Sequence, residues 1–414
     1  MITLRLKVLS RKNIRENIKS LVEKKIRIDV LGSITSIKQK DWDLCACPES
    51  FDGGNPYDPF TTYDFLSALE LSGSVGKGTG WHACHLVAKL SDEIVAVMPL
   101  YIKGHSQGEY IFDHNWAHAF ESAGGRYYPK LQSCVPFTPA TGRRFLTKKG
   151  FEKEGREALT SGLINLANQN KISSAHITFC TLDEAKALSS ERFLLRKTMQ
   201  FHWEDKGFQD FNDFLDSLTS RKRKAIKKER SIARSFWNNN GEIVKLNGSD
   251  IEPKHWERFW FFYQDTGNRK WGYPYLTKNF FEIIHKTMTD KILLVLAMEN
   301  DLPIAGALNF LGRDTLFGRY WGASKYYSCL HYEICYYQAI DYVLENGLRK
   351  IEAGAQGDHK LSRGYLPNFV YSLHWFLDEQ FGRAVNDYLN SEGQIMSKDQ
   401  KIMMEESPFR KMEE

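Results

Sequence analysis

The sequence predicts a mixed α/β protein made of two similar modules, and three observations support this prediction. First, the chain has 414 residues, which exceeds the usual size of a domain with a single hydrophobic core. Second, 42% of the residues are hydrophobic and 26% are charged, as is typical of globular proteins. Third, the two halves of the chain repeat the same order of helices, strands and turns. We therefore expect each half to form a mixed, mostly antiparallel sheet flanked by helices.

The repeat is clearest in residues 86–113 and 294–321. Each segment contains a strand, a polar turn, a second strand, a loop and a third strand, with the turns at 91–93 and 299–301. β-Branched and aromatic residues alternate with other residues around each turn, which predicts β-hairpins. Chance similarity between generic α/β patterns is the alternative. Order, spacing and turn placement all agree, however, and together they favour a duplication.

The flanking segments also match. Each meander is expected to follow a helix and to precede a second helix and an apolar strand: the helices are predicted at 60–73, 276–288, 152–169 and 331–347, and the strands at 173–180 and 349–355. Gly347 stands where a left-handed cap is expected to end the last of these helices. Because a helix between two strands requires a crossover, the last strand of each module is expected to run parallel to the one before it.

The composition along the chain suggests where the modules meet. The polar run EDKGFQDFNDF separates the two halves near residues 200–215. We expect four parts, namely a basic N-terminal extension (1–25), a first module (26–200), a second module (201–390) and a polar C-terminal tail (391–414).

The net charge of +5 is concentrated at one end of the chain. Residues 1–25 contain eight Lys/Arg and two Glu, so this segment carries +6 and the remainder carries −1. A body close to neutral is unlike a protein covered in nucleic-acid-binding surface, so DNA is not an expected partner and any polyanion contact should be local. We interpret residues 1–25 as a solvated extension, with a basic organelle-targeting peptide as the alternative and a secretory signal disfavoured.

Cysteines and apolar runs suggest the compartment. The seven cysteines are scattered without the spacing of a disulfide framework, which favours reduced thiols and a cytoplasmic location. No apolar run approaches the roughly 18–20 residues of a transmembrane helix, so no membrane span is expected. No metal is expected either, because neither histidine cluster has the Glu of a His-Glu-x-x-His site; the two clusters are His114, His118 and Glu121, and His82, Cys84 and His85.

Six motifs resemble one known family. They are HSQGEYIFDHNWAHA (105–119), GGRYYPKLQSCVPFTPATGRR (124–144), TGNRKWGYPYL (266–276), GRYWGA (318–323), LHYEICYYQAI (330–340) and EAGAQGDHKLSRGYLP (352–367). Over residues 26–390 the chain resembles the FemAB-like family, which is named for peptidoglycan biosynthesis. The resemblance implies tandem modules of the GNAT acyltransferase fold and the transfer of an acyl or aminoacyl group to an amine acceptor.

The loop after the last strand of the second module is the main candidate for catalysis. Open sheets with parallel neighbours bind ligands beyond the carboxyl ends of those strands. The glycines of this loop allow close approach of a substrate, and its polar residues are Gln356, His359, Lys360 and Arg363. The resemblance to Fem-type enzymes matches Lys360 to their loop lysine, and such a cation is suited to stabilise the oxyanion of acyl transfer. A solvated surface turn is the alternative.

The preceding strand and helix supply further candidates. In GRYWGA, Arg319 and Trp321 are expected to alternate with Tyr320 across the sheet and to face the substrate. Glu333 is expected in the first turn of the next helix, where the helix dipole favours a carboxylate for purely structural reasons as well. His331 is interpreted either as a general base or as a neighbour of the helix cap.

We infer the acyl donor from the absence of one motif and from the presence of a basic run. GNAT enzymes that use acetyl-CoA resemble one another in a Gly-rich loop that binds pyrophosphate before this helix. The loop here has Gly322 but no Gly-x-Gly. Aminoacyl-tRNA is therefore favoured over acyl-CoA, and no bound cofactor is expected. In RKRKAIKKERSIAR (221–234), the cations Arg221, Lys224, Lys227 and Lys228 can share a helix face that binds phosphates, or they can simply be solvated.

The first module is expected to bind the acceptor. His105, Glu109 and Lys130 occur among aromatic residues in two of the motifs and are expected to bind the substrate. Trp271 in TGNRKWGYPYL is expected to bind it as well. Packing between the modules is the alternative. Direct attack of the amine is expected, since no activated Ser or Cys is evident. The alternative function is a non-catalytic module that binds a glycan, a peptide or RNA.

Overall fold

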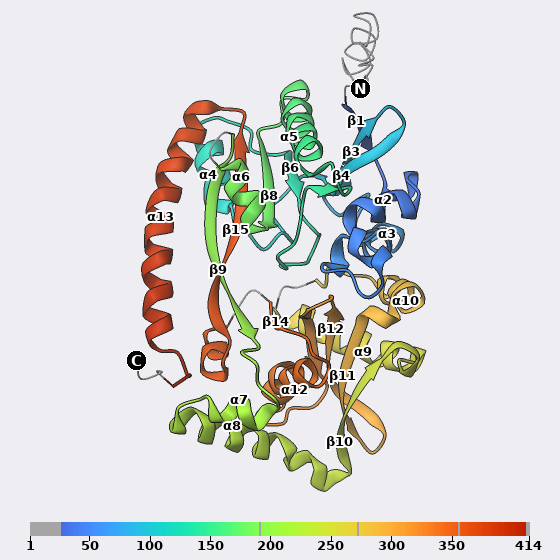
Figure 1. Cartoon of the computed structure of the whole chain (residues 1–414), viewed down its shortest axis with the longest axis vertical. Coiled ribbons are helices and arrows are strands. Elements are labelled where there is room, and N and C mark those ends of the chain that lie inside the picture. Colours follow the sequence, from blue (N-terminus) through green and yellow to red (C-terminus); the bar gives the residue numbers. More distant parts are fainter. Residues whose placement is uncertain (1–25, 190–191, 271–272, 355–356, 411–414) are drawn as a thin grey trace, which may run out of the picture.

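The chain is described by a computed structural model that covers residues 26–189, 192–270, 273–354 and 357–410. Figure 1 shows two modules stacked along the long axis of the molecule, with the first module next to the N-terminus. Two long strands, β9 (Leu194–Glu204) and β15 (Leu366–Phe376), run beside each other between the modules. The predictions for residues 1–25 concern a segment outside the described residues.

The first module begins with the edge strand of a small sheet and ends with a short helix. Its elements are β1 (Ile26–Leu31), α2 (Gln39–Ala46), α3 (Tyr63–Leu71), β2 (Trp81–Ala83), β3 (His85–Leu90), β4 (Glu93–Met98), β5 (Tyr101–Lys103), α4 (His114–Ser122), β6 (Lys130–Ser133), β7 (Leu146–Thr147), α5 (Glu152–Gln169), β8 (Ser174–Cys180) and α6 (Leu182–Leu188).

The second module follows β9 and has the longer meander. Its elements are α7 (Phe211–Asp216), α8 (Ser220–Ala233), β10 (Gly241–Asn247), α9 (Pro253–Lys270), α10 (Lys278–Thr287), β11 (Ile292–Glu299), β12 (Leu302–Leu311), β13 (Thr315–Ala323), α11 (Leu330–Tyr332), a π-helical segment (Glu333–Tyr337), α12 (Gln338–Glu345), β14 (Lys350–Glu352), a 3₁₀ segment (Asp358–Arg363), β15 and α13 (Glu379–Glu405).

The predicted hairpins are confirmed. Ser91 turns between β3 and β4 with a φ of 57°, and Asn300 and Asp301 turn between β11 and β12 with φ values of 50° and 62°. Asn and Asp tolerate this left-handed conformation, which gives a hairpin turn the twist of its strands. Gly347 has a φ of 66°, as expected of a residue that ends a helix.

The duplication is visible in the parallel strand pairs. In the first module β6 pairs with β8 in parallel across α5, and in the second β13 pairs with β14 in parallel across the helical segment 330–345. Both parallel pairs predicted from the sequence are present. The chain is therefore a tandem of two mixed α/β modules. The third strand expected at the end of residues 86–113 was wrong, because residues 104–113 form no strand and the chain passes from β5 to β6 through α4.

The modules are joined by an exchange of strands. β9, which follows the first module, pairs with β14 of the second, and β15, the last strand of the second module, pairs with β8 of the first. One hydrogen-bonded sheet thus runs through both modules in the order β10-β11-β12-β13-β14-β9-β15-β8-β6-β5-β2, beside a smaller sheet β1-β3-β4-β7. Residues 200 and 201, where the expected domain boundary lies, are both inside β9.

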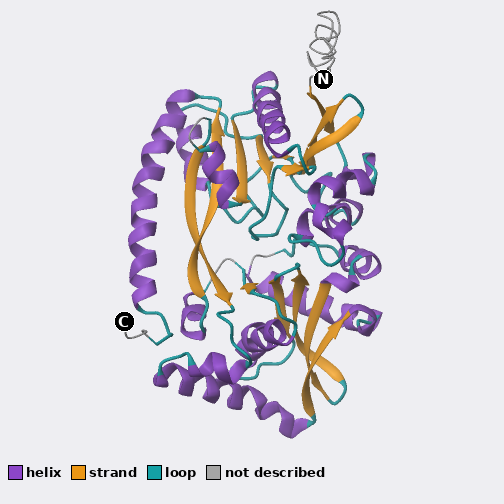
Figure 2. Cartoon of the chain, viewed as in Figure 1, coloured by secondary structure: helices purple, strands orange, loops and turns teal. Residues whose placement is uncertain are grey.

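Helices cover both faces of this sheet (Figure 2). Phe60 packs edge-on against Phe65 of the first module and against Phe310 and Phe317 of the second, at ring distances of 5.1–5.2 Å. The two modules therefore share an aromatic core. Residues 391–405, expected as a polar tail, form the second half of α13, which lies along β9 and β15 (Figure 1). Within the described ranges, no helix has both the length and the apolar character needed to cross a membrane.

Candidate active site

The strands β13 and β14 form a fork. Only Thr315–Phe317 of β13 pair with β14, which ends at Glu352. Beyond Phe317, β13 continues to Ala323 without a partner strand on this side. The segment that follows β14 turns away at Gly354, whose φ is 79°. The two parallel strands thus separate at their carboxyl ends, which is the place where open α/β sheets bind ligands.

A β-bulge at the fork changes the expected alternation of side chains. Leu308 pairs with Tyr320 and Asn309 pairs with Gly318, so Arg319 is the extra residue between these pairs. As a result, Arg319 and Tyr320 both donate to the carbonyl oxygen of Phe137 in the first module. Trp321 packs against a different hydrophobic core from Tyr320, beside the helices of residues 330–345. The expectation that Arg319 and Trp321 share one face was wrong, because a bulge redirects the side chains that follow it.

Lys360 is held at the end of β14. It is buried, and its Nζ donates to the carbonyl oxygens of Ala353 and Gly354 at 2.7 and 2.9 Å. These hydrogen bonds use two of the three donors of an ammonium group. Burial lowers the pKa of Lys360 to about 8, because a charged amine loses its hydration inside the protein. The predicted loop lysine is therefore a buried cation at the fork.

Two of the predicted histidines lie in a cluster of aromatic rings. His331 contacts Trp321 at a ring distance of 5.2 Å and His359 at 6.2 Å. The Nε2 atom of His359 is 2.9 Å from the hydroxyl oxygen of Tyr336, which comes from the π-helical segment. π-Helical segments within helices are frequent at functional sites. Sequence reasoning did not single out Tyr336, because the π-helical turn that aims it has no signal in a pattern of 3.6-residue periodicity.

Arg363 ties the loop to α8. Its guanidinium binds both carboxylate oxygens of Glu229, at 2.7 and 3.1 Å, and donates to the carbonyl oxygen of His359 at 2.6 Å. It also stacks on the ring of Tyr332, 3.5 Å from the ring centroid. Arg363 is buried, and the carboxylate of Glu229 compensates its charge.

Glu333 is fully buried in an ion pair. Arg230 of α8 lies 2.9 Å from its carboxylate and also pairs with Asp341 at 2.6 Å, while Gln338 donates to the same carboxylate. Although burial opposes it, the charges of Glu333 and Asp341 raise the pKa of Arg230. In this arrangement Glu333 joins α8 to the helix that carries Tyr336. Two other candidates, Gln356 and Trp271, lie outside the described residues.

In the first module, the predicted acceptor residues form a buried charge cluster. Lys130 Nζ lies 2.8 Å from Glu109, 2.6 Å from Asp113 and 2.8 Å from the hydroxyl of Ser106. Although burial opposes it, the charges of Asp113 and Glu109 raise the pKa of Lys130. Glu109 is also 3.3 Å from Lys103. All three donors of the Lys130 ammonium are used within the cluster, so a substrate could contact Lys130 only if one of these partners left it.

His105 is half-buried near this cluster. Its Nδ1 accepts from the backbone N–H of Gln107, so its Nε2 carries the proton and donates to the carbonyl oxygen of Thr79 at 2.9 Å. Burial, followed by the nearby charge of Lys103, lowers the pKa of His105. The neutral tautomer is therefore fixed by backbone contacts on both sides of the ring.

The basic run forms α8, as predicted. Arg221, Lys224, Lys227 and Lys228 are on the outer side of the helix, and among the described residues no acidic side chain forms an ion pair with them. Two other arginines of the helix are paired, Arg223 with Asp216 and Arg230 with Glu333. The four predicted cations thus remain available on the surface.

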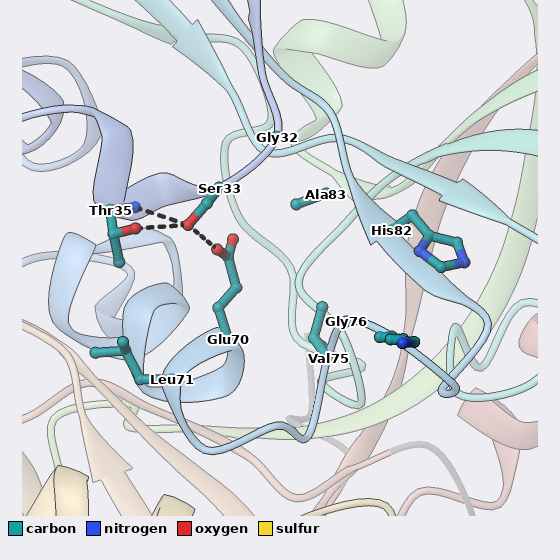
Figure 3. Close-up of a pocket in the computed structure, with 10 residues that line it drawn as sticks. Gly32, Ser33, Thr35, Glu70, Leu71, Val75, Gly76, His82 and Ala83 are labelled. Carbon is teal, nitrogen blue, oxygen red and sulfur yellow. Dashed lines mark hydrogen bonds between the residues drawn. The ribbon is translucent and has the colours of Figure 1, made fainter.

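A separate pocket of about 370 Å³ lies in the first module (Figure 3). Glu70 at its wall accepts from the hydroxyl of Ser33 at 2.7 Å, from the backbone N–H of Ile34 and from Nε2 of His85 at 2.8 Å. His85 Nδ1 accepts from the N–H of Leu100, which orients the ring so that Nε2 points at Glu70. This pocket contains none of the site residues predicted from the sequence.

The histidines and cysteines of the described part of the chain are spread over the fold. That part contains no group of three or more His, Cys, Asp or Glu side chains placed to hold a metal ion. His114 and His118 are both exposed on α4. All seven cysteines are free thiols.

One protein family matches most of the chain, and solved structures share its fold. The FemAB-like family, described as peptidoglycan biosynthesis/recognition, matches residues 33–411. The C-terminal domain of a candidate lysylphosphatidylglycerol synthetase from Agrobacterium fabrum is 7% identical, with 84% of this chain and 96% of that chain covered and a TM-score of 0.50. FemX is 13% identical, with 84% and 98% covered and a TM-score of 0.49.

A tandem GNAT protein from the clavulanic acid biosynthesis pathway is 10% identical, with 84% and 98% covered and a TM-score of 0.41. No curated protein sequence matches the chain. At 7% identity the synthetase domain bears on the fold alone, while the family match extends over more than nine-tenths of the sequence. The fold is a tandem of two mixed α/β modules that exchange their long strands, and the chain belongs to the FemAB-like family.

Proposed function

We propose that this protein is an N-acyltransferase that joins an acyl or aminoacyl group to an amine at the fork between β13 and β14. The observation that carries the proposal is the position of Lys360, a buried cation beside the carboxyl end of β14. Family membership and the GNAT-like fold support the same general class of reaction. A positioned cation in a site shielded from water stabilises a developing oxyanion strongly, because the low dielectric strengthens the interaction.

The reaction follows from this geometry. The nitrogen of the acceptor amine attacks the carbonyl carbon of the donor, and the carbonyl oxygen becomes an oxyanion beside the ammonium of Lys360. Collapse of this intermediate breaks the bond to the leaving group and forms the amide. The amine must lose a proton during the reaction, and the imidazoles of His359 and His331 are the titratable groups near the fork suited to accept it. The leaving oxygen or sulfur takes up a proton in turn.

The proposed donor is aminoacyl-tRNA rather than acyl-CoA. The surface cations Arg221, Lys224, Lys227 and Lys228 lie on α8, the helix whose Glu229 holds the catalytic loop through Arg363. Such a stripe is suited to an RNA backbone, because each neutralised phosphate releases counterions. The residues between β13 and α11 also lack the Gly-x-Gly that cradles a pyrophosphate at a helix N-terminus.

The proposed acceptor is an amine-bearing molecule that approaches from the first module. Arg319 and Tyr320 reach the carbonyl of Phe137 there, and Tyr275 stacks on the Phe137 ring at 4.8 Å. The first module therefore meets the fork directly at these residues. The family description makes amines of peptidoglycan-type peptides and amino sugars the first acceptors to screen.

Label transfer tests the function. The purified protein is incubated with an amine pool and with either labelled aminoacyl-tRNA or labelled acyl-CoA, and label in the amide product is followed over time. We expect transfer from aminoacyl-tRNA. Transfer from acyl-CoA alone would replace the proposed donor. Saturable binding of an amine or of RNA, without transfer from either donor, would instead support a recognition module.

A further inference from the structure

The helix α8 has two faces with opposite roles. Lys227 and Lys228 face outward, whereas the next two residues, Glu229 and Arg230, are turned toward the protein and paired with its interior. Ile226 and Ala233 are buried on the same inner side. The proposed RNA-binding stripe and two charged anchors therefore occupy successive positions of one helix.

Glu229 anchors α8 to the loop of Lys360. Its two oxygens bind Nη2 and Nε of Arg363 at 2.7 and 3.1 Å, in the bidentate geometry that fixes an arginine most firmly. One oxygen also accepts from the hydroxyl of Tyr337. The partners are separated by 134 residues in the sequence, so this contact joins two distant parts of the module.

Arg363 connects Glu229 to the candidate catalytic residues. Nη1 of Arg363 donates to the carbonyl oxygen of His359 at 2.6 Å, at the residue directly before Lys360. Lys360 in turn binds the carbonyls of Ala353 and Gly354 at the end of β14. The 3₁₀ segment Asp358–Arg363 is thus fixed to the sheet at one side and to α8 at the other.

Arg230 fixes the same helix a second time. It pairs with Glu333 and Asp341 across the helical segment 330–345, which carries Tyr336. α8 therefore cannot shift along its axis without disturbing contacts to both the loop and this segment. An RNA held by the outer face of α8 would have a fixed position relative to Lys360.

We propose that Glu229 is a positioning residue that sets the distance between the bound RNA and the reacting carbonyl, by fixing the Lys360 loop to the helix that holds the donor. This inference rests on the proposed function. It explains why the basic run is interrupted by an inward carboxylate at Glu229. It also predicts a selective defect, because the register between α8 and the loop matters only for a donor that reaches α8.

The test compares two donors with the variant Glu229→Gln. Full aminoacyl-tRNA spans both the stripe and the fork, whereas aminoacyl-adenosine carries the same ester but lacks the RNA that α8 would bind. Single-turnover transfer from aminoacyl-tRNA should fall by about tenfold to a hundredfold, as for a displacement near 1 Å. Transfer from aminoacyl-adenosine should change less than about twofold, and the affinity for tRNA should be retained. Arg363→Lys, which keeps the charge but removes the bidentate geometry, should show the same selectivity.

Asp216→Asn is the matched control. Asp216 is an exposed carboxylate that pairs with Arg223 of α8, so the change in net charge is the same but the loop is not involved. Both donors should react with this variant as with the wild-type protein. If Glu229→Gln melts at a clearly lower temperature, Glu229→Asp is measured instead.

Three outcomes would overturn the inference. Equal losses with both donors would show that Glu229 only supports the loop. Unchanged transfer with both donors would show that the contact is dispensable, while the proposed function would stand. Absence of transfer by the wild-type protein from either donor would remove the proposed function and this inference together.

Discussion

His176 and His374 face each other across the exchanged strands, with their Nδ1 atoms 2.7 Å apart. His176 belongs to β8 of the first module and His374 to β15, the last strand of the second. Their Nε2 atoms are each 2.9 Å from a serine hydroxyl, that of Ser174 and that of Ser372. Only one proton fits between the two Nδ1 atoms, so the two rings cannot both be charged.

This pair predicts a loss of stability in mild acid. Burial, and the charge of Lys130, lower the pKa of His176 to about 3; burial, and the nearness of His176, lower the pKa of His374. Arg196 acts in the same direction on both rings, and Asp113 opposes it. In the unfolded chain each ring takes up a proton below about pH 6.5. The unfolded state therefore binds more protons, and the free energy of unfolding should fall by about 1.4 kcal/mol per pH unit for each histidine below that pH.

Urea unfolding midpoints between pH 7 and pH 4.5 measure this effect. His374→Leu should lower stability at pH 7, because Ser372 and His176 lose a partner, but it should reduce the pH dependence. The exposed His118, replaced by Leu, is the control and should leave the pH dependence as in the wild type. An equally steep acid dependence in His374→Leu would contradict the prediction.

Replacing Lys360 should strongly reduce acyl transfer. Loss of one oxyanion donor typically costs roughly 2.7–4 kcal/mol of transition-state stabilisation, so Lys360→Met should lower single-turnover transfer about a hundredfold or more. Because Lys360 is buried and binds two carbonyl groups, some stability should be lost as well, which circular dichroism melting records separately. His359→Ala should lower the rate of transfer as well, because it removes one of the two imidazoles suited to accept the proton of the amine. Near-normal turnover by Lys360→Met would exclude this loop as the catalytic one.

The rate of transfer should depend on pH through Lys360. With a pKa of about 8, its ammonium is charged below pH 8 and loses its proton above it. The rate should therefore increase with pH in the acidic range, as the acceptor amine loses its proton. It should decrease above about pH 8, as Lys360 loses its proton. In Lys360→Arg the falling limb should move to higher pH, since guanidinium remains charged throughout the accessible range. A wild-type rate that keeps rising to about pH 9.5, well above the pKa of Lys360, would show that the cation is not required.

The outer face of α8 should determine the salt dependence of RNA binding. Replacing Lys224, Lys227 and Lys228 with Gln removes three surface cations. The slope of log affinity against log salt should become shallower by up to about 0.9 for each phosphate that is no longer neutralised, or by about 2–3 in total. Filter binding of tRNA from about 50 to 200 mM salt, a range in which phosphate contacts strongly affect affinity, measures this slope. An unchanged slope would count against RNA binding by this helix.

Two glycines should respond to alanine in opposite ways. A Cβ atom at Gly322 of β13 would lie 2.3 Å from the backbone oxygen of Phe262 in α9, so Gly322→Ala must push the helix from the sheet. We expect destabilisation of about 1–3 kcal/mol, as for overpacked cores. At Gly382 in α13 the nearest atom would be Phe376 Cβ at 3.6 Å, an ordinary contact. Gly382→Ala should raise stability by up to about 1 kcal/mol through helix propensity. Similar melting temperatures for the two variants would contradict this.

The local elements and their order could be predicted from the amino-acid sequence. The helix predicted at 152–169 is α5 at the same residues, the turns at 91–93 and 299–301 are hairpin turns, and the basic run is helical. These features depend on residues close in the chain, through apolar periodicity, turn propensity and helix ends, and such signals are legible in one sequence. The repeated order of these elements also predicted the duplication.

Which distant residues meet was decided by the tertiary structure. The bulge that separates Arg319 from Trp321 arises from pairing with β12, and the burial of Lys130 depends on carboxylates supplied by the chain before it. The exchange of β9 and β15 and the contact of Glu229 with Arg363 join segments far apart in the sequence. A pattern of neighbouring residues carries no information about such partners, because burial and pairing depend on the packing of the whole chain.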